Sequence, residues 1–230
     1  LHLNLQNPVY RRITLSALEH ATAVFYVTPN LKGYLGAYEN KLVYLPNPVD
    51  VQAIARDPIA PARVAKVLIF TRLDPVTGVD QIFPAAQTLS RTIELTALSW
   101  GPLRTSYRQT YGRFVSFVRP LPRPAIGPFL QQFDLVIGQM QQGILSLMEI
   151  EAMAAGRPVI TGINLDLYRD DPPPVLRASD PERIIAAVES LRSRPQELAR
   201  LSRDGRDWVV RNHSHAHHLE VLEAAYFGKA

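Results

Sequence analysis

Two glutamates two residues apart could do different chemistry in the stretch SLMEIEAMAAG. Ser146, followed three residues later by Glu149, fits a capping box, in which the two side chains bond backbone amides at a helix start. Glu151 has no such explanation. It lies four residues after Leu147 and three before Ala154, so it shares their inward-facing side of the predicted helix. Because a buried charge needs a partner, the pattern predicts either an ion pair with an arginine or a polar ligand.

The elements around this helix must position both carboxylates. Leu135–Ile137 is a continuous apolar run typical of a buried parallel strand, and a loop over 138–145 separates it from the helix. Gly156 is suited to the left-handed helix end, and Val159–Thr161 predicts the next strand. Strand, helix and strand would form a right-handed crossover, and open parallel sheets bind ligands above the carboxyl ends of their strands.

The rest of the chain repeats this alternation of apolar runs and amphipathic segments. Further strands are expected at 67–70, 92–98, 113–118 and 175–178, and helices at 124–133, from Pro181 and from Pro195. Residues 101–112 have no clear period and are expected to form a polar connection. The predicted fold class is α/β, a Rossmann-like parallel sheet with helices on both faces.

Composition limits the functional classes. The 230 residues are 47% hydrophobic and carry a formal net charge of +4, with a pI near 9.5. This arginine-dominated excess suits a phosphate-bearing ligand or an anionic membrane surface, and no aromatic-interleaved basic motif favours nucleic acid. No cysteine is present, which excludes disulfides, cysteine metal sites and thiol catalysis. Without a membrane-length apolar run or a signal peptide, a cytoplasmic location is expected, with peripheral contact at the inner membrane surface as an option.

Neither of two further patterns predicts a metal site. His213 and His217 have a spacing that can hold a metal, but they lack a carboxylate-rich shell. Asp166, Asp170 and Asp171 do not form an Asp-x-Asp pattern. We therefore expect no metal.

The segment EAMAAGRPVITG resembles the EAMA-x-G-x-PV signature of family 4 glycosyltransferases of the GT-B architecture. The resemblance implies that Glu151 binds the ribose hydroxyls of a nucleotide-sugar donor. A second family glutamate lies eight positions earlier and opens a Gly-Phe-Gly-like turn that touches the transferred sugar. The matching residues here are Gly143, Ile144, Leu145 and Ser146, so only backbone contacts to the sugar are expected from them.

A second segment, TRLDPVTGVD, resembles the family's GRL-x-x-x-KG-x-D segment. Four residues keep its register: Arg72, Leu73, Gly78 and Asp80. The resemblance implies that Arg72 binds the donor diphosphate, which a guanidinium does through paired hydrogen bonds. Thr71 stands where the family has glycine, and Thr77, which stands where it has lysine, is kept as a donor-binding candidate. In the family, backbone groups just after a later strand contact the nucleotide base. The matching strand here is expected at 113–118, so Val118 and Arg119 are candidates for binding the base.

The stretch YLPNPVD resembles the PN-x-V-D sequence that closes the N-terminal domain in this family. The similarity implies that residues 1–50 are the remnant of an acceptor-side domain with its linker. Residues 51–230 would form the donor-binding Rossmann-like domain, with a terminal helix at about 213–226 packing back on the N-terminal part. The chain starts with Leu1 rather than methionine, which predicts a fragment or a trimmed chain.

The resemblance implies a hexosyltransferase that moves a sugar from a nucleotide-diphosphate-sugar donor, with retention, to an unknown glycan or lipid acceptor. The donor is a co-substrate, and no cofactor is expected. The helix start near Ser146 and the Arg72 side chain would stabilise the leaving phosphates. No catalytic residue is assigned, because the acceptor-side groups lie in a domain that is mostly missing, and the fragment alone can be inactive.

Two other classes stay open. Gly143 and Thr77, standing where the family has glutamate and lysine, favour a non-catalytic nucleotide-sugar binder. A regulatory Rossmann-like domain without a nucleotide ligand is the other alternative.

Overall fold

The computed structural model describes residues 7–228. It divides the chain into two compact units, Leu1–Asn47 with His218–Ala230 and Pro48–His217. The sequence places the boundary near residue 50. That the first unit is the remnant of an acceptor-side domain stays a prediction.

The larger unit contains a six-stranded sheet in the order β5-β4-β3-β6-β7-β8, in which every pair of neighbours is parallel. Its strands are β3 (Lys66–Ile69), β4 (Glu94–Leu98), β5 (Ser116–Val118), β6 (Leu135–Ile137), β7 (Val159–Thr161) and β8 (Leu176–Arg177). Val67 is in register with Leu135, and Ile137 with Ile160. The predicted parallel sheet is therefore confirmed, and its strand order reverses direction between β3 and β6, the crevice where such sheets bind ligands.

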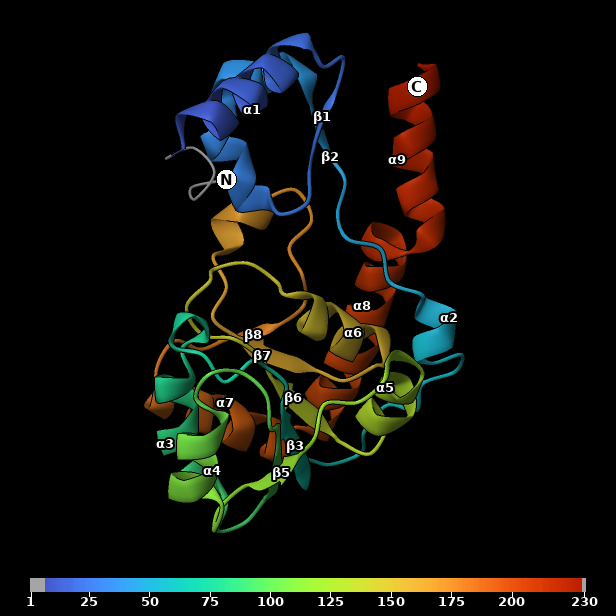
Figure 1. Ribbon diagram of the computed structural model, residues 1–230. Helices are drawn as coiled ribbons and strands as arrows, with labels where there is room; N and C mark the ends of the chain where they lie inside the picture. The colour runs from blue at the N-terminus through green and yellow to red at the C-terminus, as the bar shows by residue number, and fades with distance from the viewer. Residues whose placement is uncertain (1–6, 229–230) are drawn as a thin grey trace. The chain divides into compact units, whose positions relative to one another are not determined.

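Helices cover both faces of this sheet, as predicted (Figure 1). One face carries α3 (Val79–Leu89), α4 (Arg104–Tyr111) and α7 (Pro181–Ser193). The other carries α2 (Val51–Ile54), α5 (Arg123–Leu130) and α6 (Leu147–Ala154). The long helix α8 (Pro195–His213) places Leu198 in the first core and Trp208 in the second. Each face thus has its own apolar core, and the sheet is buried between them.

Helix α4 corrects one expectation, because residues 101–112 were predicted to be an irregular connection. Tyr107 and Tyr111, one turn apart, pack on Phe83 of α3 with ring centroids 4.7 and 4.9 Å away. These two aromatic rings supply the helix's contact with the core. The remaining residues of α4 are polar, so its sequence shows no recognisable apolar stripe.

A buried arginine fixes the segment that enters the larger unit. The Arg157 guanidinium donates to the carbonyl oxygens of Phe133 (2.8 Å), Ala155 (3.1 Å) and Ile59. Burial lowers the pKa of Arg157. Nearby, the Val49 amide donates to the His213 carbonyl at 2.7 Å. The entering segment is therefore tied to the sheet, to α6 and to the end of α8.

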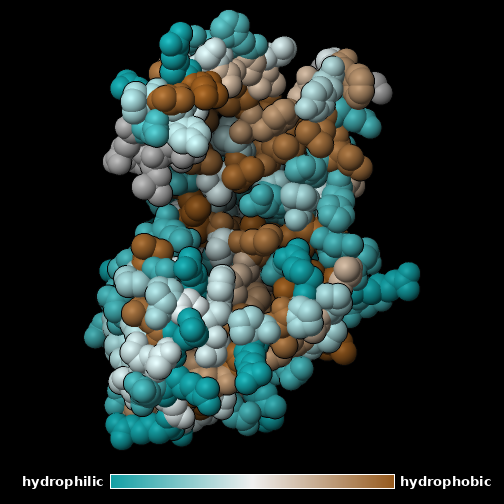
Figure 2. All heavy atoms as spheres, in the orientation of Figure 1, coloured by the Kyte–Doolittle hydropathy of each residue, from teal (hydrophilic) through white to brown (hydrophobic). Residues whose placement is uncertain are grey.

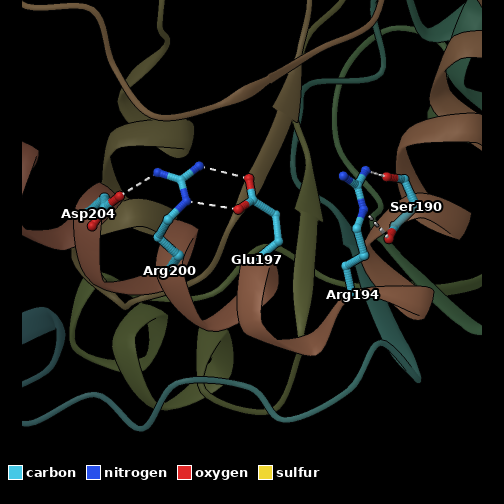
Figure 3. Close-up of polar contacts among 5 residues, drawn as sticks. All are labelled: Ser190, Arg194, Glu197, Arg200 and Asp204. Carbon is cyan, nitrogen blue, oxygen red and sulfur yellow. Dashed lines mark hydrogen bonds and ion pairs between the residues drawn. The ribbon is translucent and has the colours of Figure 1, made fainter.

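Ion pairs on the surface join successive turns at the start of α8 (Figure 3). Arg200 donates to Glu197 at 2.8 and 2.7 Å and to Asp204 at 2.6 Å, while Arg194 bonds Ser190. The hydrogen bonds from Arg200 lower the pKa of Glu197. Because these groups are exposed, we expect the pairs to contribute little to stability.

The smaller unit has a separate two-stranded parallel sheet of β1 (Val24–Tyr26) and β2 (Leu42–Tyr44). Around it are α1 (Pro8–His20), the 3₁₀ helices η1 (Pro29–Tyr34) and η2 (Gly36–Lys41), and most of α9 (His215–Phe227). Tyr226 lies 6.2 Å from Phe25 between ring centroids, and the His218 ring lies 3.2 Å from the Pro46 oxygen. Apolar surface is visible over α1 and α9 in Figure 2. Val9 and Ile13 of α1 and Leu219 and Phe227 of α9 are exposed. Among residues 7–228, no helix is long and apolar enough to cross a membrane.

Replacing the buried arginine should destabilise the larger unit. Arg157→Met leaves the Phe133 and Ile59 carbonyl oxygens without their donor, whereas the Ala155 oxygen keeps its bond from Gln131, so we expect the free energy of unfolding to fall by about 2–4 kcal/mol. Urea unfolding followed by tryptophan fluorescence measures this. The control is Arg203→Met, at an exposed position of α8, which should change stability by less than about 0.5 kcal/mol. Equal stability of the two variants would contradict the structural role of Arg157.

Candidate functional site

The carboxylate of Glu149 lies between the ends of strands β6 and β7 and the start of helix α6. One oxygen, Oε2, accepts a hydrogen bond from the Ser146 amide at 2.6 Å. The other, Oε1, accepts from the Gln139 amide at 3.0 Å and is hydrogen-bonded to the Thr161 hydroxyl. The predicted capping box is confirmed. The side chain is completely buried, however, so it joins the end of β6, the end of β7 and the start of α6 rather than only capping a helix.

This packing limits the space beside the Glu149 carboxylate and shifts its pKa. A Cβ atom on Gly138 would lie 2.0 Å from Glu149 Oε1, so only glycine leaves room for the carboxylate. Burial raises the pKa of Glu149, and its hydrogen bonds oppose that rise. The Thr161 hydroxyl also lies 2.9 Å from the Gln139 carbonyl. A protonated Glu149 could therefore donate to Thr161, which would donate onward to Gln139.

Glu151 has the arginine partner that the sequence left open. Its side chain is only 3% exposed, and its Oε1 accepts from Arg123 Nη1 at 2.5 Å. Burial raises the pKa of Glu151, and Arg123 opposes the rise. The Arg123 side chain is 67% exposed. Within the described part of the chain, Oε2 of Glu151 has no hydrogen-bond donor, so one oxygen of a buried carboxylate remains available.

Arg72 follows β3, at the point where the strand order reverses. Its side chain is 51% exposed, lies 3.5 Å from Asp74 and stands over the Trp100 ring at 5.8 Å from the centroid. Sequence reasoning missed Trp100, although an aromatic residue two positions after a buried strand was a usable signal. Gly101, with φ +106°, lets this loop approach the Leu73 backbone, where a Cβ atom would lie 2.5 Å from the Leu73 oxygen.

Thr77 shapes the loop that carries Arg72. Its side chain is buried, and its hydroxyl lies 2.7 Å from the Arg72 carbonyl and 2.8 Å from the Asp74 carbonyl. Its single hydroxyl hydrogen is already used within the loop. A direct contact between this side chain and a donor stays a prediction.

The loop over 143–146 has fewer free backbone amides for a ligand than the sequence predicts. The Leu145 amide donates to the Tyr168 hydroxyl at 3.0 Å, and the Ser146 amide is taken by Glu149. Burial raises the pKa of Tyr168 to about 12, so this hydroxyl stays neutral. The Gly143 residue has φ +70° and bridges to Ile163.

Three amides in and after this loop have no acceptor within residues 7–228. They belong to Ile144, Leu147 and Met148. The last two open α6, where free amides and the helix dipole favour anions.

The base-reading candidates lie at the end of β5. The Val118 carbonyl accepts from the Ser99 amide at 2.7 Å, and Arg119 is exposed with no hydrogen bond or ion pair to another described residue. His213 is buried against Trp208, with ring centroids 5.1 Å apart. Among the described residues, no group of three or more His, Asp or Glu side chains could hold a metal, and the expectation of no metal stays a prediction.

Comparison with solved structures shows which proteins share this fold. Sucrose-phosphate synthase from Thermosynechococcus elongatus matches 97% of this chain with a TM-score of 0.76 and 20% identity. HepE from Anabaena, solved in complex with UDP, matches 96% with a TM-score of 0.78 and 12% identity. The C-terminal domain of LpcC, a glycosyl transferase group 1 family protein from Francisella tularensis, matches 73% with a TM-score of 0.56 and 19% identity.

These likenesses confirm the predicted GT-B fold, whereas family 4 membership stays a prediction. The chain spans 63% of the sucrose-phosphate synthase chain, 68% of the HepE chain and 99% of the LpcC domain. No protein-family model matches the sequence, and no curated protein matches it either.

Removing the Glu149 carboxylate should be costly. Glu149→Ala leaves the buried Gln139 and Ser146 amides without their acceptor, so we expect a loss of about 3–5 kcal/mol in the free energy of unfolding. This exceeds the loss of about 1 kcal/mol expected from a simple helix cap. Glu182→Ala, at an exposed first-turn position of α7, is the control and should lose less than about 1 kcal/mol. Similar losses in both variants would contradict the structural role of the Glu149 carboxylate.

The pH dependence of stability provides a second readout of the same prediction. Because the pKa of Glu149 is raised in the folded state, its contribution is complete below the unfolded-state pKa and is lost as pH rises through the folded-state pKa. Glu149→Gln should therefore flatten the decline of stability with rising pH. Some decline should remain, because burial also raises the pKa of Glu151.

Proposed function

We propose that this chain is the donor-binding part of a glycosyltransferase that uses a nucleotide-diphosphate sugar. The observation that carries the proposal is the buried Glu151 carboxylate, which has one oxygen without a donor among the described residues. A carboxylate of this kind can accept hydrogen bonds from ribose hydroxyls. HepE, which shares the fold, was solved with UDP and with UDP-glucose, which supports this ligand class.

In the proposed complex, Glu151 binds the ribose and Arg72 binds the diphosphate. The amides of Ile144, Leu147 and Met148 donate to the phosphates or to the transferred sugar. The loop that begins at Gly143 lies against that sugar through its backbone. Val118 and Arg119, at the end of β5, lie beside the nucleotide base.

In the proposed complex, Arg123 must release or share the Glu151 carboxylate when the ribose binds. Because the guanidinium is mostly exposed, it can move aside or turn toward a phosphate while Glu151 bonds a hydroxyl. Because the Glu151 carboxylate is buried, losing Arg123 alone would be costly, so the guanidinium can leave only when a ribose hydroxyl takes its place. Arg123 is therefore an additional donor-side residue that the family resemblance does not supply.

The reaction we propose is hexosyl transfer with retention of configuration. Negative charge develops on the leaving diphosphate, and Arg72 with the free amides of α6 stabilises it without a metal. The acceptor, a glycan or a lipid, binds outside these donor-side residues. A cytoplasmic location with peripheral membrane contact belongs to this proposal.

A non-catalytic nucleotide-sugar binder is the second candidate. Gly143 supplies no carboxylate where the family has one, and Thr77 supplies no cation and commits its hydroxyl to its own loop. Incubation of the full-length protein with UDP-glucose distinguishes the two. For the enzyme we expect release of free UDP from UDP-glucose, and a suitable acceptor should increase it. Binding of UDP-glucose without any release of UDP would identify a non-catalytic binder.

Calorimetric titration with uridine and with UDP tests the assignment of the site. Glu151→Gln should weaken both ligands roughly tenfold or more, because it removes a charge-assisted bond to the ribose. Arg72→Ala should weaken UDP by a similar factor and leave uridine unchanged, because uridine has no diphosphate. Arg104→Ala, exposed at the start of α4, is the matched control and should change neither affinity.

Two results would reject this assignment. Wild-type affinity for UDP in Glu151→Gln would show that the carboxylate only pairs with Arg123. No binding of any nucleoside diphosphate by the wild-type chain would favour a regulatory domain without a nucleotide ligand.

A further inference from the structure

A pocket opens at the same edge of the sheet, beside the proposed donor site, with which it shares Gly143. It has a volume of about 570 Å³ and is lined by the loops that follow β6, β7 and β8 and by the start of α7. Arg72 and Arg119 follow β3 and β5, on the other side of the strand order. The pocket therefore lies to the side of the reversal point where the nucleotide is expected.

Two arginines from different elements line this pocket. Arg177 ends the edge strand β8, and its side chain has no hydrogen bond or ion pair with another described residue. Arg183, in the first turn of α7, lies 3.3 Å from Asp180 through Nε and 3.2 Å from the Ser179 hydroxyl through Nη1. Its Nη2 has no partner within residues 7–228. One complete guanidinium and one free guanidinium nitrogen are thus available in the pocket.

The remaining lining adds polar groups and a small apolar wall. Asn164 uses its side-chain oxygen to accept from the Asp166 amide at 3.1 Å, which leaves its amide nitrogen as a donor. Met140 and Ile163 supply apolar surface. The only carboxylate in contact with these arginines among the described residues, Asp180, also accepts from the Arg183 amide at 2.8 Å as the cap of α7. The available groups are mostly donors, which suits an anion.

We propose that this pocket binds a phosphomonoester as a second ligand, separate from the nucleotide. A phosphate group offers three oxygens, so guanidinium groups from two elements can bind it together. The volume exceeds that of a bare phosphate and falls in the range of small-molecule sites, which leaves room for the carbon skeleton. Gly143 forms part of the wall, so the second ligand would lie next to the loop proposed for the transferred sugar.

Calorimetry with glucose 6-phosphate, inorganic phosphate and glucose tests this proposal at constant ionic strength. We expect the wild-type chain to bind glucose 6-phosphate, with inorganic phosphate weaker and glucose without effect. Arg177→Gln and Arg183→Gln should each weaken glucose 6-phosphate at least tenfold and leave UDP affinity unchanged. Arg192→Gln is the matched control, because Arg192 lies on the same helix outside the pocket and pairs with Glu189. It should bind like wild type.

The outcomes separate this proposal from the proposed function. Glu151→Gln should lose UDP affinity and keep glucose 6-phosphate affinity, so either site can fail alone. The absence of glucose 6-phosphate binding to the wild-type chain would overturn the second site. Unchanged glucose 6-phosphate affinity in both arginine variants would also overturn it. So would a loss of UDP affinity together with glucose 6-phosphate affinity in these variants, because that result would assign the pocket to the nucleotide diphosphate. Thermal melts of both variants check folding, and exposed positions such as Arg177 are expected to tolerate the change.

Discussion

The rest of the larger unit depends on one buried carboxylate, that of Glu149. It accepts two backbone amides, one from Gln139 after β6 and one from Ser146 before α6, and it contacts the Thr161 hydroxyl at the end of β7. Because a buried charge or acid must satisfy its hydrogen bonds, the helix can start at only one place relative to the sheet. This constraint also requires glycine at position 138.

The fixed helix start determines what α6 presents to a ligand. Glu149 and Glu151 are two residues apart and therefore point in directions about 200° apart around the helix axis. The first faces the sheet and holds the scaffold, and the second faces α5, where Arg123 contacts it. The same start leaves the amides of Leu147 and Met148 without intrahelical acceptors. In the proposed function, stability and ligand recognition thus come from neighbouring residues of one short helix.

Local sequence patterns determined most of the fold. The apolar runs at 67–70, 135–137 and 159–161 are short and continuous, which is how strands buried on both faces read, and all three are parallel strands of one sheet. The capping box and the glycine at position 156 mark the two ends of α6 in the same way. The apolar pattern did not predict helix α4. Tyr107 and Tyr111 are its main contacts with the core, and two aromatic residues do not form a recognisable apolar face.

The sequence by itself determined that Glu151 needs a partner and that Glu149 caps a helix, because both follow from spacing within a few residues. Only the tertiary structure decided that the partner includes Arg123, which lies 28 residues away in the chain. It also decided that Tyr168 takes the Leu145 amide, because that contact joins segments 23 residues apart. Hydrogen bonds between distant segments depend on how the loops pack at the sheet edge, and no local periodicity encodes that packing.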